Sequence, residues 1–264
     1  MGQDICRNME SPGKGMILSL RLTAVAGMAD KGSVVCDVGC DHGFVPIYLV
    51  KNGVCPRVIA MDVNREPLET AREHIRNYAL EDYIETRLSD GVSALSKGEA
   101  DTLICAGMGG RLIKRILIQG GEKISSMKTL ILQPQSELQG VREYLRQEGY
   151  LIVAEDMILE DGKYYSLLKV CPHPAEREVN AAKQTEKEKK KDGTEDRRRR
   201  VEDRYGPCLL NNCHPVLLQF LNRENRLYKE ILDRMEDCGS RQEKRKKEIR
   251  DKVEEINFAL SYYN

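Results

Sequence analysis

The chain has 264 residues, and its 42 lysines and arginines are balanced by 42 aspartates and glutamates. A net charge of zero excludes a chain-wide basic field for nucleic acid, so any such surface requires local segregation of charge. The length has room for one good-sized core and an appendage.

No stretch approaches the roughly 18 apolar residues of a membrane span, and residues 1–15 lack the apolar run of a signal peptide. The nine cysteines form no Cys-x-x-Cys pair. Cys208 and Cys213-His214 come nearest to a metal cluster, but no second pair of ligands has zinc spacing. We therefore expect no membrane partner, no metal site, reduced thiols and a cytoplasmic location.

The chain begins with a polar segment, residues 1–15, which we expect to be a flexible arm. Ser19 is placed to cap a helix over residues 20–29. Arg21 lies at the start of this helix, and the pattern alone indicates a solvated surface arginine.

Val34 to Pro46 is the stretch around which the chain is organised, because it predicts a buried strand, a sharp glycine turn and a helix start. Gly39 and Gly43 allow unusual backbone angles and close approach of a ligand. Asp37 and Asp41 would repel a pyrophosphate but would attract a cation such as the sulfonium of S-adenosylmethionine. A tight turn that binds nothing is the alternative.

The next two predicted strands also end in acids. Residues 58–61 lead to Asp62, which is placed to accept hydrogen bonds from both hydroxyls of a ribose. Residues 84–88 lead to Ser89-Asp90-Gly91, where Asp90 can accept the N6 amino group of an adenine. A loop acid without a partner and an ordinary Asp-Gly turn are the respective alternatives.

The fourth predicted strand, residues 102–105, runs into Ala106-Gly107-Met108-Gly109-Gly110 and a helix over 112–118. Glycines leave little side-chain bulk, so this turn suits a flat substrate ring beside the donor. Met108 would pack on that ring or take an ordinary core position.

The remaining elements complete an α/β domain over residues 16–171. A fifth strand at 130–132, a helix at 137–148 and strands at 150–153 and 164–170 follow in order. The alternation predicts a doubly wound, Rossmann-like parallel sheet with helices on both faces and an antiparallel edge.

The C-terminal third has a different composition. Residues 172–206 contain long charged runs, which predict a solvated linker, with Arg197 to Arg200 as alternative phosphate contacts. Residues 207–264 carry two apolar stripes interrupted at Gly239-Ser240 and predict an antiparallel helical, coiled-coil-like hairpin. The basic residues Lys244 to Lys247 indicate either a solvated face or one that grips RNA.

Six motifs together resemble the bacterial tRNA (adenine(22)-N1)-methyltransferase family. In chain order they are Asp37-Val-Gly-Cys-Asp-His-Gly, Asp62, Ser89-Asp90-Gly91, Ala106-Gly107-Met108-Gly109-Gly110, Leu130-Ile-Leu-Gln-Pro and Glu160-Asp-Gly-Lys-Tyr-Tyr165. The resemblance covers residues 18–171 well and the C-terminal hairpin loosely.

The resemblance implies a class I methyltransferase fold, S-adenosylmethionine as the methyl donor and N1 of a tRNA adenine as the acceptor. It implies that the donor is lined by Asp37, Gly39, Asp62, Asp90, Gly91 and Gly107. It places Asp41 beside the target base as the catalytic acid group, and it makes Arg21, His42 and Met108 candidate substrate contacts. Two departures are Gly43 and Phe44, where the family usually has alanine and tyrosine. A third is Asp62, where a glutamate is common.

Three other functions are compatible with parts of the pattern. A nicotinamide-dependent oxidoreductase would use the same fold, although the chain lacks a spaced Gly-x-Gly-x-x-Gly. A non-catalytic RNA-binding protein would use only the basic hairpin. Amino-directed DNA methylation would require a different motif after the fourth strand than Ala-Gly-Met-Gly. We expect tRNA as partner and a monomer, although nothing in the sequence fixes the oligomeric state.

Overall fold

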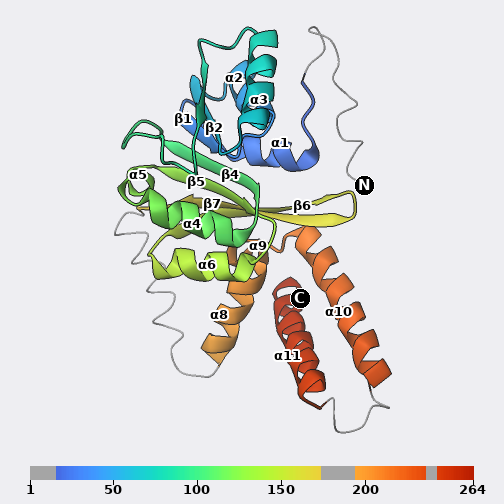
Figure 1. Cartoon of the computed structure of the whole chain (residues 1–264). Coiled ribbons are helices and arrows are strands. Elements are labelled where there is room, and N and C mark those ends of the chain that lie inside the picture. The colour runs from blue at the N-terminus through green and yellow to red at the C-terminus, as the bar shows by residue number, and fades with distance from the viewer. Residues whose placement is uncertain (1–15, 174–193, 236–242) are drawn as a thin grey trace.

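The computed structural model describes residues 16–173, 194–235 and 243–264. The expected arm at 1–15 and the expected helix break at Gly239-Ser240 lie outside the described residues. Seven strands form one sheet in the order β3-β2-β1-β4-β5-β7-β6 (Figure 1). The strands are β1 Val34–Val38, β2 Arg57–Asp62, β3 Ile84–Leu88, β4 Thr102–Met108, β5 Thr129–Pro134, β6 Leu151–Glu160 and β7 Lys163–Cys171.

The first five strands are parallel, and β7 pairs antiparallel with both β5 and β6. The predicted doubly wound sheet with an antiparallel edge is therefore confirmed. The strand order reverses between β1 and β4, and such a switch point opens a crevice at the carboxyl ends of the strands.

Helices cover both faces of the sheet, as the alternating pattern predicts (Figure 1). One face packs against α1 Leu20–Gly27, α2 Phe44–Lys51 and α3 Arg65–Asn77. The other packs against α4 Gly110–Gly120, α5 Glu122–Ser125 and α6 Leu138–Gln147. Two separate apolar cores result, and together they fix the strand ends at which a ligand would bind.

Several element ends differ from the predicted ones for local reasons. Ser19 caps α1 as predicted, since its Oγ accepts the Leu22 N–H at 3.3 Å. α2 begins at Phe44, ahead of Pro46, because left-handed Gly43 is its N-cap. β4 continues to Met108, because its glycine segment still pairs with β5 across a bulge between Ala106 and Met108.

The prediction of a linker over 172–206 is wrong for its last part, which forms α8, Thr194–Tyr205. Val201 and Tyr205 are buried, so a few apolar side chains order the helix. Buried Arg142 of α6 pairs with Glu155 at 2.8 Å and donates to the carbonyl oxygens of Asp203 and Arg204 at the end of α8. The ion pair and the hydrogen bonds of Arg142 thus stabilise the position of α8, which buries few apolar side chains. The run Glu186 to Lys191 lies outside the described residues.

The C-terminal segment continues with α9 Pro207–Asn211, α10 Pro215–Met235, α11 Glu243–Leu260 and the short 3₁₀ helix η2 Ser261–Tyr263. The predicted packing of two long helices is confirmed by α10 and α11. Their core includes Met157 of β6, with Tyr164 of β7 packed against it, so these helices are attached to the edge of the sheet.

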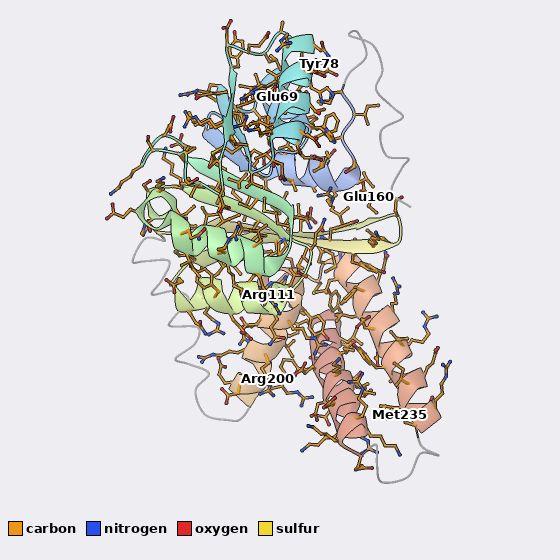
Figure 2. All side chains as sticks on the ribbon, in the orientation of Figure 1. Glu69, Tyr78, Arg111, Glu160, Arg200 and Met235 are labelled. Carbon is orange, nitrogen blue, oxygen red and sulfur yellow. The ribbon has the colours of Figure 1, made fainter. Side chains whose placement is uncertain are left out.

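The predicted basic face is only partly exposed. Lys246 of α11 is buried, whereas Lys244 and Lys247 are exposed. In α8, Arg197 pairs with Glu254 and Arg200 with Glu255, so these two arginines of the run face α11 (Arg200 is labelled in Figure 2). None of the described helices is long and apolar enough to cross a membrane.

We predict that Gly206→Ala destabilises the chain strongly. Gly206 has φ 102° and ψ 119°, and a Cβ there would lie 2.6 Å from one carboxylate oxygen of Glu155. A clash with a buried ion pair should cost about 2 kcal/mol or more of unfolding free energy. Urea denaturation of the variant and the wild type measures this loss of unfolding free energy. Gly149→Ala is the control, since φ there is 77° and no atom lies within 4 Å, so only backbone strain is added. Equal losses in both variants would contradict the proposed clash.

Candidate active site

The turn after β1 is held tightly against β2. The N–H groups of Gly39 and Cys40 both donate to the Met61 carbonyl oxygen, at 2.8 and 3.0 Å. Gly39, Asp41 and Gly43 all have positive φ, of 74°, 51° and 74°. A side chain at position 39 would overlap the methyl group of Met108, which therefore lies directly on the turn. The structure thus brings Met108 to Gly39.

Asp62 joins this turn to the end of β2. Its Oδ1 accepts the Asn64 N–H at 2.8 Å, and its Oδ2 accepts the Asp41 N–H at 3.4 Å. Asp62 is buried, and each carboxylate oxygen still has a lone pair to offer. The predicted ribose acid therefore lies where a ligand on the Gly39 turn would reach it.

Asp37, Asp41 and Asp62 form an acid cluster around the turn. Burial, and after it the charges of Asp62 and Asp41, raise the pKa of the Asp37 carboxyl to about 7. The pKa of the Cys40 thiol is raised by burial and then by the same three carboxylates. Removing such negative charges from water is costly, and a cation bound at the turn would offset that cost.

Asp41 is the member of the cluster that faces solvent, with its side chain 70% exposed. His42 lies beside it, with Nε2 3.5 Å from an Asp41 carboxylate oxygen. His74 contacts the His42 carbonyl oxygen through Nδ1 at 2.8 Å and stacks on Phe44 with a 5.3 Å centroid distance. Phe44, where the resembled family has tyrosine, thus packs the base of the turn.

Asp90 and Gly91 lie at the end of β3, beside the β2 end, because the Ser89 N–H donates to the Asp62 carbonyl oxygen at 2.8 Å. Asp90 pairs with Arg115 of α4 at 3.0 Å, and both side chains are more than half exposed. An exposed pair of this kind is weak, so a ligand amino group can compete for the carboxylate.

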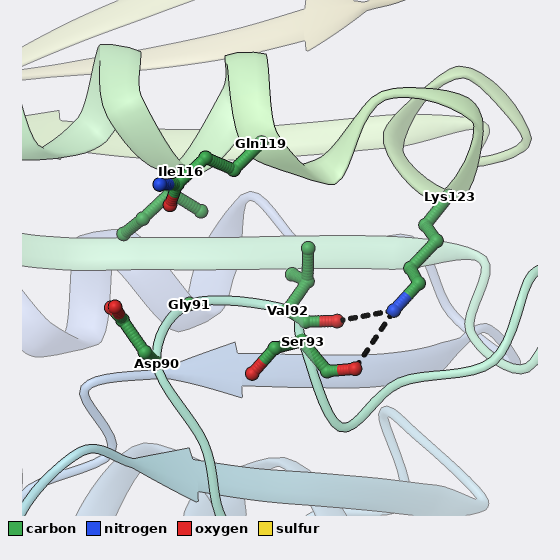
Figure 3. A pocket seen from close by; sticks show the side chains of 7 residues that line it. All are labelled: Asp90, Gly91, Val92, Ser93, Ile116, Gln119 and Lys123. Atoms are coloured by element: carbon green, nitrogen blue, oxygen red, sulfur yellow. Dashed lines mark hydrogen bonds between the residues drawn. The ribbon is translucent and has the colours of Figure 1, made fainter.

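A cavity of about 240 Å³ lies between the loop Asp90–Ser93 and the helices α4 and α5 (Figure 3). Lys123 reaches across to this loop and donates to the carbonyl oxygens of Val92 and Ser93 at 3.1 and 2.8 Å. The cavity shares only Asp90 and Gly91 with the predicted donor site. Lys123 therefore holds this loop beside the predicted donor site.

Arg21 and Gly107 meet at Gln133, a residue that the sequence reasoning missed. The Oε1 atom of Gln133 accepts the Gly107 N–H at 2.9 Å and Arg21 Nη1 at 3.0 Å. The Arg21 guanidinium lies 5.5 Å from the centre of the Tyr165 ring. The backbone N–H of Arg21 donates to Oε1 of Glu160, which lies at the tip of the β6–β7 hairpin (Figure 2), at 3.4 Å. The predicted surface arginine is thus held at the site by three elements. The Leu-Gln-Pro motif was the signal that could have found Gln133.

The profile of the methyltransferase domain family matches residues 18–168, which is more than half of the chain. The chain belongs to this methyltransferase family.

The resemblance seen in the sequence is confirmed by individual relatives. The tRNA (adenine(22)-N(1))-methyltransferase of Bacillus subtilis is 38% identical over 151 residues, which are 57% of this chain and 63% of the relative. The match therefore spans less than two thirds of the length of that relative.

Solved structures extend the likeness to the C-terminal helices. The crystal structure of the B. subtilis m1A22 tRNA methyltransferase matches with a TM-score of 0.75 and 28% identity, and covers 93% of this chain and 100% of that chain. A candidate tRNA (m1A22) methyltransferase of Streptococcus pneumoniae, in complex with S-adenosyl-L-methionine, matches with a TM-score of 0.75 and 29% identity. That match covers 92% of this chain and 100% of the other.

We predict that Asp37→Asn stabilises the ligand-free protein at pH 8. The folded-state pKa of Asp37 is raised to about 7 from the model-compound value of 3.8, so folding favours the protonated acid. The wild type therefore loses stability as pH rises from about 4 to about 7, by up to about 4 kcal/mol at 1.4 kcal/mol per pKa unit. The Asp37→Asn variant lacks this loss. Its gain in unfolding free energy over the wild type should therefore grow between pH 4 and pH 7 and stay constant above that range, as the two pKa values of about 4 and about 7 require.

Thermal melting of both proteins at pH 5 and pH 8 measures the difference. Asp82→Asn, at an exposed acid, is the matched control and should melt like the wild type at both pH values. An Asp37→Asn advantage that is the same at both pH values would contradict the raised pKa.

Proposed function

We propose that the chain is an S-adenosylmethionine-dependent methyltransferase that transfers a methyl group to N1 of an adenine in tRNA, at position 22. The acid cluster at the Gly39 turn is the observation that carries the proposal. The family membership and the named relatives support the same reaction. A cytoplasmic location and tRNA as partner follow from this substrate, and a monomer stays the expected state.

The residues present fit the methyl donor. Three carboxylates surround a turn that offers a positively charged sulfonium a negative field. Gly39 has no side chain, and Met108 occupies the space where its Cβ would lie, so Met108 would share this part of the turn with the ligand. Asp62 would hold the ribose hydroxyls, and Asp90 would accept the adenine amino group once Arg115 gives way. Gly91 and Gly107 would line the same crevice.

A nicotinamide dinucleotide fits less well. Its pyrophosphate would lie in the field of Asp37, Asp41 and Asp62, where like charges repel. A protein that only binds RNA would have no need for an acid cluster in a crevice. These two alternatives therefore have weaker support than methyl transfer.

The chemistry required of the protein is mainly alignment. S-adenosylmethionine supplies an electrophilic methyl group when it is bound. N1 of adenine already carries an in-plane lone pair, so no strong base is needed to create the nucleophile. Holding N1 in line with the methyl group can contribute about 7–11 kcal/mol of the barrier. N1 is occupied in a Watson–Crick pair, so the base has to be unpaired or turned out of the stack.

Asp41 is the residue placed to act on the base. Its carboxylate is exposed at the edge of the turn, where positive charge develops on the adenine ring during transfer. It can accept a hydrogen bond or a proton from N6. His42, 3.5 Å away, orients this carboxylate. Met108 packs between the turn and the acceptor side.

Contacts with the rest of the tRNA are proposed for two regions. Arg21 lies beside the Gly107 turn, where the target nucleotide would enter. Lys244 and Lys247 are exposed on α11 and can contact phosphates.

The direct test is nucleoside analysis by mass spectrometry of unmodified tRNA incubated with the protein and S-adenosylmethionine. We expect 1-methyladenosine, and none when the adenine at position 22 is replaced by guanine. Methylation of the tRNA that carries guanine at position 22 would contradict the proposed target position. Donor binding without any methyl transfer would contradict the enzyme and favour an RNA-binding protein.

We predict that two acids of the cluster separate binding from chemistry. Asp41→Asn should lower kcat about a hundredfold, because it removes a charge that stabilises the transition state. Its affinity for the donor should hardly change. Asp62→Ala should weaken donor binding about tenfold or more, through loss of charge-assisted hydrogen bonds. Calorimetry with S-adenosylmethionine and steady-state kinetics measure the two effects. Unchanged turnover in Asp41→Asn would remove this residue from the mechanism.

A further inference from the structure

Gln133 is a fully buried polar residue near the carboxyl end of β5. Its single side-chain oxygen accepts two hydrogen bonds from different parts of the chain, the Gly107 backbone N–H and the Arg21 guanidinium. The residue therefore joins the carboxyl end of β4 to helix α1.

The orientation of the Gln133 amide is fixed by these partners. Both are donors, so only the oxygen can face them, and Nε2 has to point away. Nε2 is buried and has no hydrogen-bond partner among the described residues. An unpaired buried donor lowers stability, so the fold alone does not explain a glutamine here.

Arg21 is held by more than Gln133. Its guanidinium lies over the Tyr165 ring, and its Nη1 would lie 3.8 Å from a Cβ at Gly107. Only one of the five N–H groups of this guanidinium is used by Gln133. The remaining donors form a planar fork that matches a phosphate. A cation at this place suits an anionic group better than an adenine ring that becomes positive on methylation.

The arrangement lies on the acceptor side of the crevice. The acids expected to hold the donor are on β1, β2 and β3, whereas Gln133 is on β5, beyond β4. Of the residues expected to line the donor, Gly107 contacts Gln133, through its backbone N–H. A change at Gln133 should therefore weaken binding of the RNA substrate much more than binding of the donor.

We propose that Gln133 is a positioning residue for the RNA substrate. It holds the Arg21 guanidinium against the Gly107 turn so that Arg21 binds a backbone phosphate of the target nucleotide while its base lies beside that turn. This inference rests on the proposed function and names the substrate contact within it.

The test compares the full-length wild type with Gln133→Met, Arg21→Met and the double variant. We measure tRNA affinity by titration, kcat/KM for unmodified tRNA, and donor affinity by calorimetry. Each single variant should weaken tRNA binding and kcat/KM about tenfold or more, the scale of one charge-assisted contact. The double variant should lose little beyond the worse single one, because both changes remove one interaction. Donor affinity should fall much less than tRNA affinity, because Gln133 reaches the donor side only through the Gly107 N–H.

Two further variants separate positioning from a structural role. Gln133→Glu keeps an acceptor for both donors, so it should recover a large part of the tRNA affinity that Gln133→Met loses. Gln139→Met makes the same change at an exposed glutamine of α6 and should behave as the wild type.

The proposal is overturned if Gln133→Met weakens donor binding as much as tRNA binding. It is also overturned if the loss of tRNA affinity in the double variant equals the product of the losses in the two single variants. The third contradicting result is a tRNA affinity of Gln133→Glu no higher than that of Gln133→Met. A wild-type protein that binds tRNA but methylates none refutes the proposed function, and the affinity comparison still decides the role of Gln133.

Discussion

The structure of the site depends on a concentration of negative charge at a tight backbone corner. Asp37, Asp41 and Asp62 are brought together where β1 and β2 end, and the most buried of them has its pKa raised to about 7. Holding such a group in the folded chain is unfavourable without a compensating cation. The cost is tolerated because the two apolar cores fix β1 and β2 in register. The acid cluster is thus held in place at a cost to the stability of the folded chain, and we propose that a positive ligand offsets this cost.

The contacts around Arg21 are built from the other half of the sheet. They join Gly107, near the end of β4, to residues of β5, of the β6–β7 hairpin and of α1. The hairpin also carries the C-terminal helices, whose core includes Met157 of β6. A buried ion pair between Arg142 and Glu155 anchors α8 and α9 to the same edge. The β6–β7 hairpin therefore contacts both Arg21 and the C-terminal helices.

Sequence patterns predicted most of the sheet because buried parallel strands are short apolar runs that end in glycine or acid. They predicted Asp37, Gly39 and Asp62 as donor contacts, since each lies at or next to the carboxyl end of a strand. They missed Gln133, because a glutamine in an apolar run carries no periodic signal. The helix at 194–205 was also missed, because its few apolar residues are outnumbered by charges whose partners, such as Glu254 and Glu255, come from α11.

The sequence by itself determined the α/β order, the acidic glycine turn and the resemblance to tRNA methyltransferases, because these reside in contiguous residues with local backbone requirements. Only the tertiary structure decided that Arg21 donates to Gln133, that Lys246 is buried and that Asp90 pairs with Arg115. Those outcomes depend on contacts between residues far apart in the chain. The free energy of such contacts is set by burial and by the geometry of the partner, neither of which a single segment encodes.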